Sequence, residues 1–563
     1  MIKVKILLTI YILAFSFLSA AKVTIIHNIK GYTINQHKLV EFSTIAFEHG
    51  RILQIGTKDE LSKLYTDAKL IDGQGRSLLP GLHDSHTDIM QAAEMSTQLD
   101  LRNTKSLDET LVKIQNYINA HPDKNWIEGY GWNHKIWANK QLPNNKDLDE
   151  LETDKPIWLL SNDKQTGWAN TKTMKITKAF KYKKQPRFGK ILFDGNGKHT
   201  GIYISHGINI IQPHISRTSI PQEYRLFIKI LKQLSSQGIT SLDDSEIDNR
   251  TYNIYTGLAR GGKLPIRVNA IISTAEKALD SLLAKGSYHE ENQFLHIHTI
   301  KYYVDGNLDF HGAAMFEPYI DNKKSTGQIK QPIHFLKQDI PLHTANGWQV
   351  AIAAVGDRAN NIALEVLLNE NVKTTELRHR IEHATIISLT DFKRFKQSSL
   401  IVSIQPNFAI AELTILKKAI DRQRLKGAYA WQTLIKQGAI LISGSNFPIV
   451  SANPFYGMHA AVTRKDRNAS SRPWIPIERL TVKQALESYS INPAYANRQE
   501  DSLGSLEAGK WADFILIDQD IFTIKPDNIW QTKVLQTWVA GKKIYDRKEV
   551  QAQETIFKNT LEK

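Results

Sequence analysis

The sequence contains no cysteine, which excludes two kinds of site. Without thiols, the 563-residue chain forms no disulfide and holds no metal through a thiolate. Any metal ligand must therefore be a nitrogen or oxygen atom. The absence is compatible with an oxidising compartment but does not identify one.

The sequence also lacks an apolar run long enough to span a membrane comfortably. Its N-terminal apolar run, ILLTIYILAFSFL, follows the basic start MIKVK and precedes the small residues SAA. This arrangement is typical of a secretory signal peptide. We expect cleavage after Ala21, or after the neighbouring Ala20, to leave an exported protein, periplasmic or secreted, with no stable membrane span. An uncleaved anchor is the alternative.

Basic residues are not gathered in one block, although the formal net charge is +15. Because Asn, Ile and Lys are plentiful throughout, the base composition of the coding DNA explains this charge as well as a nucleic-acid partner does. We expect no nucleic-acid partner, and a small-molecule substrate or ligand instead. With 41% hydrophobic and 23% charged residues, the chain has the composition of a folded protein. The sequence does not predict its oligomeric state.

The two ends of the chain share one sequence pattern. Residues 22–77 and 504–550 carry short alternating runs separated by glycine and polar turns, such as STIAFEHGRILQIG and VLQTWVAGKKIY. Such runs are typical of antiparallel strands. We predict that the two ends form one small composite β domain, resembling a sandwich, beside the domain between them.

Residues 78–503 alternate strand-like apolar runs with amphipathic helices, which predicts an α/β fold with a parallel sheet. A (β/α)8 barrel of the TIM type, with insertions, is the best interpretation at this length. Polar residues follow several of the predicted strands, where barrels place their chemistry. The strand candidates are PIWLLS, ITSLDD, IRVNAII, TIKYYVDG, QVAIAAVGD, HRIEHA, LIVSIQP and AILISGSN.

A series of motifs resembles the amidohydrolase superfamily, in particular the amidohydrolase family 3 branch that includes formamide deformylase-like and exoenzyme-regulatory proteins. In chain order they are LLPGLHDSHTD, DKQTGWANTK, TIKYYVDGNL, VAIAAVGDRA, RIEHA, VSIQP, LKGAYAWQTL, ISGSNFPI, NPAYA and GSLEAGKWADFILID. The resemblance covers nearly the whole chain after residue 21, and it suggests a bacterial origin. It implies a barrel with a small sheet domain built from both termini.

The resemblance also implies a metal-dependent hydrolase of non-peptide carbon–nitrogen bonds. In the family, one or two divalent metals are held by a His-x-His pair, a lysine that is often carboxylated, and later histidines. The corresponding ligand positions here are His86, Asp88, Lys301 and His383, and the position of the catalytic general base is Asn446. The metal activates water, and the base accepts its proton.

This sequence departs from the family at several of these positions. Asp88 replaces the second histidine of the pair, Gln165 replaces a histidine that faces the substrate, and Ala353 replaces a later histidine. Asn446 stands where the general-base aspartate is expected, and an amide has no basic oxygen. Together these losses predict that the two-metal enzyme is impaired or inactive, which makes the chain a candidate pseudoenzyme.

The sequence leaves open whether one divalent metal such as zinc is bound, or none, and whether Lys301 is carboxylated. One alternative is an active single-metal hydrolase that uses His86, Asp88 and His383. Another is an exported binding or regulatory protein without hydrolysis. If no metal is bound, a further hypothesis is an ion pair between Asp88 and Lys301.

Several other side chains are candidates for ligand contacts. Gln165 can donate a hydrogen bond to a substrate or accept one from it. Three aromatic residues, Trp132, Trp168 and Tyr429, can line a small-molecule cleft or belong to the core. Arg424 can bind an acidic substrate group or form a structural salt bridge.

His296 and His298 form an apparent His-x-His pair. Strand alternation predicts that both point to the face opposite Lys301, so a metal shared with that lysine is not expected.

Overall fold

The computed structural model describes residues 22–162, 164–187, 189–215, 218–372, 374–396, 400–468 and 470–553. The predicted signal peptide, residues 1–21, lies outside them. Within these residues, no helix has both the length and the apolar character required to cross a membrane. The chain divides into two compact units: Met1–Thr87, Leu231–Tyr252 and Ala259–Lys563 form the first, and Asp88–Ile230 with Asn253–Leu258 the second.

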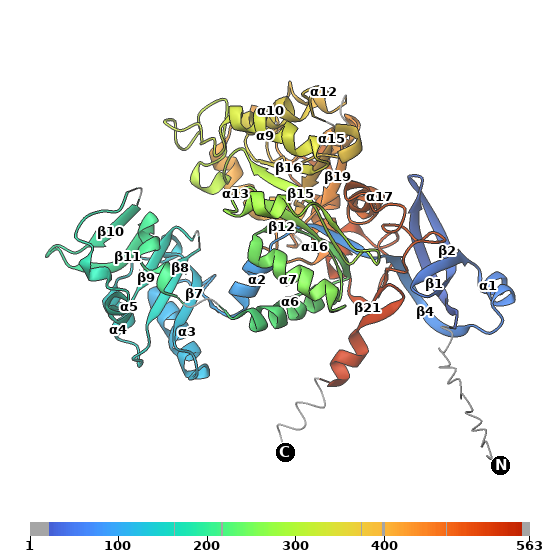
Figure 1. Cartoon of the computed structure of the whole chain (residues 1–563), viewed down its shortest axis with the longest axis horizontal. Coiled ribbons are helices and arrows are strands. Elements are labelled where there is room, and N and C mark those ends of the chain that lie inside the picture. Colours follow the sequence, from blue (N-terminus) through green and yellow to red (C-terminus); the bar gives the residue numbers. More distant parts are fainter. Residues whose placement is uncertain are drawn as a thin grey trace, which may run out of the picture. The chain divides into compact units, whose positions relative to one another are not determined.

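Eight parallel strands in the first unit form a TIM-type barrel (Figure 1). The sheet order is β19-β18-β17-β16-β15-β13-β12-β5, and a parallel bridge between Thr87 and Phe447 joins the two edges. The strands are β5 (Leu82–Thr87), β12 (Ile239–Ile247), β13 (Arg267–Ser273), β15 (Leu295–Tyr303), β16 (Gln349–Ala354), β17 (Arg380–His383), β18 (Ile401–Ile404) and β19 (Ile440–Ser443). The predicted barrel is confirmed.

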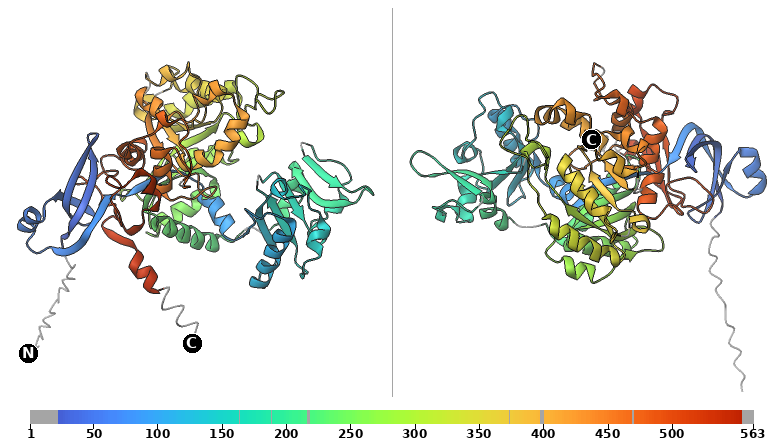
Figure 2. Two further views of the ribbon diagram at one scale, coloured as in Figure 1. Left: turned by 180° about the vertical axis from the view of Figure 1, so that it is seen from behind. Right: turned by 90° about the horizontal axis from the view of Figure 1, so that it is seen from above.

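These strands read as almost continuous apolar runs because both of their faces are buried, one by the barrel interior and one by helices. Figure 2 shows helices outside the strands. The helices from residue 220 onward are α6 (Ile220–Ser235), α7 (Asn249–Arg260), α8 (Leu279–Leu283), α9 (Ile333–Ala345), α10 (Asp357–Leu367), α11 (Thr374–Leu377), α12 (Phe392–Phe395), α13 (Pro406–Ala419), α14 (Arg422–Leu425), α15 (Trp431–Lys436), α16 (Pro454–Thr463), α17 (Val482–Ser488) and α18 (Ile491–Ala496).

Strands from the two ends of the chain pair in one seven-stranded sheet. The sheet is mixed, because β1 and β4 are parallel while the other pairs are antiparallel. Arg267 of the barrel and Asp513 of this sheet domain form a buried ion pair at 2.7 Å. The elements are β1 (Thr24–Asn35), β2 (Lys38–Glu48), β3 (Arg51–Gly56), α1 (Lys58–Leu64), β4 (Lys69–Pro80), β20 (Phe514–Ile517), β21 (Val534–Val539) and β22 (Lys542–Asp546).

The second unit contains a six-stranded sheet of its own, and its core is rich in tryptophan. PIWLLS is β8 of this sheet, so its assignment to the barrel is wrong. The barrel strand that replaces it is β5, which contains the first motif. The elements are α2 (Ile89–Ser96), β6 (Leu99–Asp100), α3 (Leu107–Ala120), β7 (Ile127–Trp132), α4 (Asn145–Asp149), β8 (Ile157–Ser161), β9 (Thr166–Ala169), α5 (Thr171–Ile176), β10 (Gly189–Phe193) and β11 (His199–Ser205).

Candidate functional site

Two predicted ligands, His86 and His383, lie side by side at the carboxyl end of the barrel. His86 is near the end of β5 and His383 is the last residue of β17. Their ring centroids are 4.8 Å apart. Because the strands are parallel, two residues far apart in sequence meet at one edge of the sheet.

Each of the two imidazoles is held through its Nδ1 atom. His86 Nδ1 lies 2.6 Å from Oε2 of Glu382, and His383 Nδ1 lies 3.0 Å from Oε1 of Gln405. Both partners are oxygen acceptors, so each Nδ1 carries the proton and donates it. This leaves the Nε2 lone pair of each ring available, which is how histidine ligands of metals are usually oriented.

Electrostatics favours the neutral form of both rings. Burial, together with the neighbouring charges of His86 and Lys301, lowers the pKa of His383 to about 3. Burial and the charge of Lys301 also lower the pKa of His86, although its bond to Glu382 opposes the shift. Neutral imidazole is the form that binds a metal.

Lys301 is an ammonium paired with Glu246. Its Nζ donates to Oε1 of Glu246 at 2.9 Å. Burial opposes the charge of Lys301, but Glu246, Tyr303 and Glu382 outweigh it and raise the lysine pKa above its usual value. An ammonium does not add CO2, so this ion pair opposes carboxylation of Lys301. Asp88, the partner predicted for Lys301, caps the N-terminus of α2 and accepts the amide N–H of Gln91 at 2.8 Å.

Glu246 itself is an ionised and accessible carboxylate. It lies on β12, and its side chain is 44% exposed. Burial opposes its charge, but the positive charge of Lys301 and the nearby His86 and His383 lower its pKa. Glu246 therefore supplies a carboxylate oxygen beside the two imidazoles.

A buried chain of charged groups supports His86 from inside the barrel. Glu382, which accepts from His86, also pairs with Arg380 at 2.7 Å, and Arg380 Nη1 donates to Oδ2 of Asp243 at 2.6 Å. His83 Nε2 lies 2.8 Å from Oδ1 of Asp243. Burial opposes the charge of Glu382, but Arg380 and His86 outweigh it and lower its pKa. The carboxylate that orients His86 is thus kept ionised.

The segment at the family's general-base position holds the backbone of His86. The amide N–H of Asn446 donates to the carbonyl of His86 at 2.9 Å. Ser445 donates its amide N–H to Asp84 at 2.8 Å, and its hydroxyl donates to the same carboxylate. A Cβ at Gly444 would lie 2.4 Å from His86 N, so only glycine fits there. This segment thus contacts β5 through its backbone and Ser445, although residue 446 is an asparagine and not an aspartate.

The other carboxylates near the barrel edge already have backbone partners. Asp305 accepts the N–H groups of Ala314, Val355 and Gly356 at 2.7 to 2.9 Å. Asp357 accepts the N–H group of Phe316 at 2.9 Å. These contacts are structural, which leaves Glu246 as the carboxylate best placed for proton transfer.

The remaining predicted contact residues belong to other elements of the two units. Trp168, in the second unit, is fully buried among Trp132 and other core residues, and its Nε1 donates to the carbonyl of Asn144 at 2.8 Å. Gln165 directly precedes β9 in the same unit. The Arg424 guanidinium donates to Asp421 and to two backbone carbonyls, each at 2.9 Å. Arg424 therefore forms the structural salt bridge that was the alternative to a substrate contact. Ala353 is buried in β16.

Tyr429 is also buried, and its hydroxyl donates to Glu412 of α13. Burial raises the pKa of Glu412 from 4.5 to about 7. Between these values the folded chain holds a proton that the unfolded chain has released, so this group's contribution to stability is present below about pH 4.5 and is lost as pH rises through about 7.

We expect Glu412→Gln to remove this dependence. Relative to the unaltered chain, the variant gains up to about 3 kcal/mol in free energy of unfolding as pH rises across this window. Denaturant unfolding at several pH values checks it. Glu370→Gln, at an exposed position, is the control and leaves the profile unchanged. Parallel pH profiles for Glu412→Gln and the unaltered chain would show that Glu412 is not the titrating group.

Sequence reasoning missed Glu246, Arg380 and Asp243. For Glu246 a signal was present, because LDDSEID places an acidic residue at the end of a predicted barrel strand. Arg380 was visible as a charged residue inside the apolar strand HRIEHA, where a charge requires a buried partner. No local pattern names that partner.

Comparison with known proteins shows the family of this chain. Residues 69–545 match the amidohydrolase family, and the chain belongs to that family. It is 28% identical to Protein LONG AFTER FAR-RED 3 of Arabidopsis thaliana, covering 89% of this chain and 88% of that protein. It is 23% identical to the N-substituted formamide deformylase of Arthrobacter pascens, covering 88% and 94%.

Among solved structures, an uncharacterized metal-dependent hydrolase from Pyrococcus horikoshii OT3 has the same fold. The TM-score is 0.76 at 24% identity, covering 90% of this chain and 99% of that one. This likeness concerns the fold. The chemistry that this chain can perform has to be inferred from the residues at the carboxyl end of its barrel.

Proposed function

We propose that this chain is a hydrolase of non-peptide carbon–nitrogen bonds that uses one divalent metal instead of two. The observation that carries the proposal is the pair of neutral imidazoles, His86 and His383, with both Nδ1 atoms held by oxygen acceptors. The two imidazoles supply nitrogen ligands of the kind that zinc takes, and the Glu246 carboxylate lies near them as a proton acceptor. Ala353 and Asn446 remove donors that a second ion would need.

Within this proposal, each residue has a separate duty. His86 and His383 would hold the metal, and Asp88 remains a predicted further ligand. When bound, such an ion would lower the pKa of water and polarise a carbonyl group. Glu246 would accept a proton from the attacking water and pass it to the leaving nitrogen. Lys301 is a positioning residue, because its ammonium keeps Glu246 ionised and fixes one of its oxygens.

The N-substituted formamide deformylase suggests where a substrate search begins. We expect the zinc-loaded chain to hydrolyse at least one member of a panel of N-substituted formamides and other small amides. Glu246→Gln lowers kcat by about 100-fold or more, as expected for loss of a general base. The control His334→Ala, at an exposed position on α9, leaves kcat unchanged.

The second candidate is a small-molecule-binding protein without hydrolysis. The ion pair between Lys301 and Glu246 favours the binding protein, because the Glu246 carboxylate compensates the buried positive charge of Lys301 without a metal. The same panel separates the two candidates. Zinc binding at His86 and His383 with no turnover of any amide would contradict the hydrolase and support the binding protein.

A further inference from the structure

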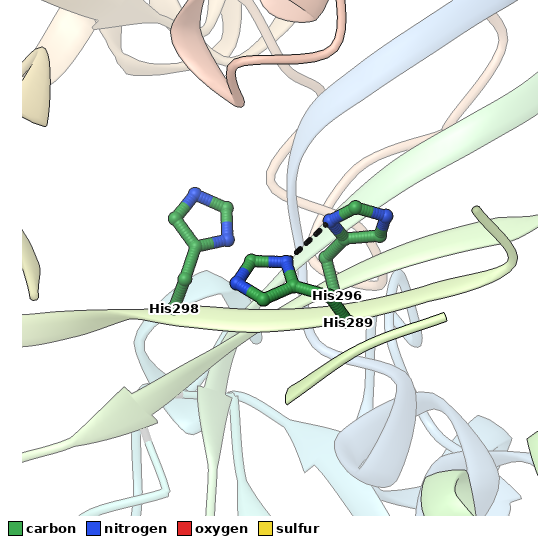
Figure 3. A group of neighbouring side chains, drawn as sticks. All are labelled: His289, His296 and His298. Carbon is green, nitrogen blue, oxygen red and sulfur yellow. Dashed lines mark hydrogen bonds between the residues drawn. The ribbon is translucent and has the colours of Figure 1, made fainter. Parts of the chain in front are cut away.

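Three histidines outside the site described above gather near the amino end of β15. His296 and His298 lie on β15, and His289 lies on β14 (Tyr288–His289), which pairs antiparallel with it. Figure 3 shows the three rings on one side of these strands, with His296 between the other two. Among the described residues, these three form the group of histidine and carboxylate ligand atoms that lie within 4.8 Å of one another.

A register shift between β13 and β15 explains why simple strand alternation assigned His296 to the wrong face. Asn269 of β13 pairs with His296, but Ile271 pairs with Thr299, so two steps along β13 match three along β15. Paired residues of parallel strands share a face, and the extra residue therefore brings His296 to the face of Thr299 and Lys301. The prediction that His296 and Lys301 lie on opposite faces is wrong. Lys301 is nevertheless about 10 Å further along the strand than His298.

Three ring nitrogens of this cluster lack a hydrogen-bond partner among the described residues. They are both nitrogens of His298, which is 1% exposed, and Nε2 of His296, which is 8% exposed. Leaving a buried polar nitrogen without a hydrogen bond costs about 1–3 kcal/mol of folding free energy. Such groups require an explanation, and an ion bound by His298 would satisfy one of its two nitrogens.

The spacing of the nitrogens fits a shared metal ion. Nδ1 of His289 lies 3.0 Å from Nδ1 of His296. Two nitrogens bound tetrahedrally to one zinc, each at about 2.0–2.1 Å, are roughly 3.3 Å apart. A small rotation of either ring would place both lone pairs on one ion, and His298 is within reach as the third ligand.

The donor atoms of the cluster restrict which ion it accepts. All three are imidazole nitrogens. Nitrogen donors disfavour Mg²⁺ and Ca²⁺, which prefer oxygen ligands. Imidazole ligands suit Zn²⁺, Cu²⁺ and Ni²⁺.

We propose that His289, His296 and His298 form a second transition-metal site of the zinc class, separate from the centre at the carboxyl end of the barrel. Three imidazoles leave a fourth position open on a tetrahedral ion. His289 is exposed and gives the ion a route in from solvent.

The test measures zinc binding by the whole chain carrying His383→Ala, which removes a ligand of the other centre. We expect one zinc ion per chain by calorimetric titration with zinc alone. Adding His289→Ala weakens this binding by about 100-fold or more, whereas adding the exposed control His334→Ala leaves it unchanged.

His289→Ala removes an exposed side chain, so folding is expected to survive, and its thermal unfolding is compared with that of the control. His296→Asn, which keeps a polar group at the buried position, serves as a second variant. Replacing zinc with cobalt gives a spectroscopic readout of tetrahedral nitrogen ligation in the His383→Ala chain. Absence of zinc from that chain, or equal affinity with and without His289, would overturn the proposal.

Discussion

Replacement of Arg380 by leucine lowers the free energy of unfolding by about 3–5 kcal/mol. The guanidinium is fully buried and pairs with both Asp243 and Glu382, which are also fully buried. Leucine fills part of the space but leaves two carboxylates without their cation. Removing one partner of a buried ionic group costs more than the intact group contributes, because the remaining charges stay unpaired.

Denaturant unfolding of the Arg380→Leu chain measures this change. The matched control is Arg422→Leu, because Arg422 is exposed on α14, and we expect an effect within about 0.5 kcal/mol. An effect of Arg380→Leu no larger than that of the control would contradict the account of the buried network. Arg380→Lys keeps one positive charge without the two-sided geometry, and its loss of stability lies between the two.

His383→Ala and His86→Ala each weaken zinc binding at the carboxyl end of the barrel by about 100-fold or more. Each substitution removes one of the two imidazole ligands outright. Gln405→Leu removes only the acceptor that orients His383, so we expect a smaller loss of about 10- to 100-fold. This graded series follows because Gln405 contacts Nδ1 of His383, whereas Nε2 would bind the ion. Calorimetric titration measures it.

A different order of these effects would separate a metal site from a merely structural histidine pair. If Gln405→Leu weakened zinc binding as much as His383→Ala, orientation would not be distinguishable from direct ligation. If neither substitution changed the affinity, His383 would not be a ligand. The unaltered chain and His334→Ala provide the reference values.

Much of the barrel could be predicted because its strands repeat one signal. An apolar run that ends in polar residues recurs from ITSLDD to AILISGSN, and the motif order matches a known family. PIWLLS carries the same local signal, yet it pairs in the six-stranded sheet of the second unit. An apolar run predicts a strand, but it does not specify the sheet that the strand joins.

The site was only partly predictable for a similar reason. His86 and His383 could be found because the family resemblance implies metal ligands at these two positions, and they do lie together. Glu246 was missed as the partner of Lys301, because sequence spacing does not say which carboxylate an ammonium reaches across a barrel. The histidine cluster was missed because its third member, His289, lies on β14, and no local pattern shows that β14 pairs with β15 beside His296.

The most direct test of the single-metal centre is the zinc content of the chain carrying His289→Ala, measured by inductively coupled plasma mass spectrometry after incubation with zinc and removal of free metal. This background removes a ligand of the other proposed site. The account predicts one zinc ion per chain, lost when His383→Ala is added. No zinc in the His289→Ala chain, or zinc that persists after His383→Ala is added, would contradict it.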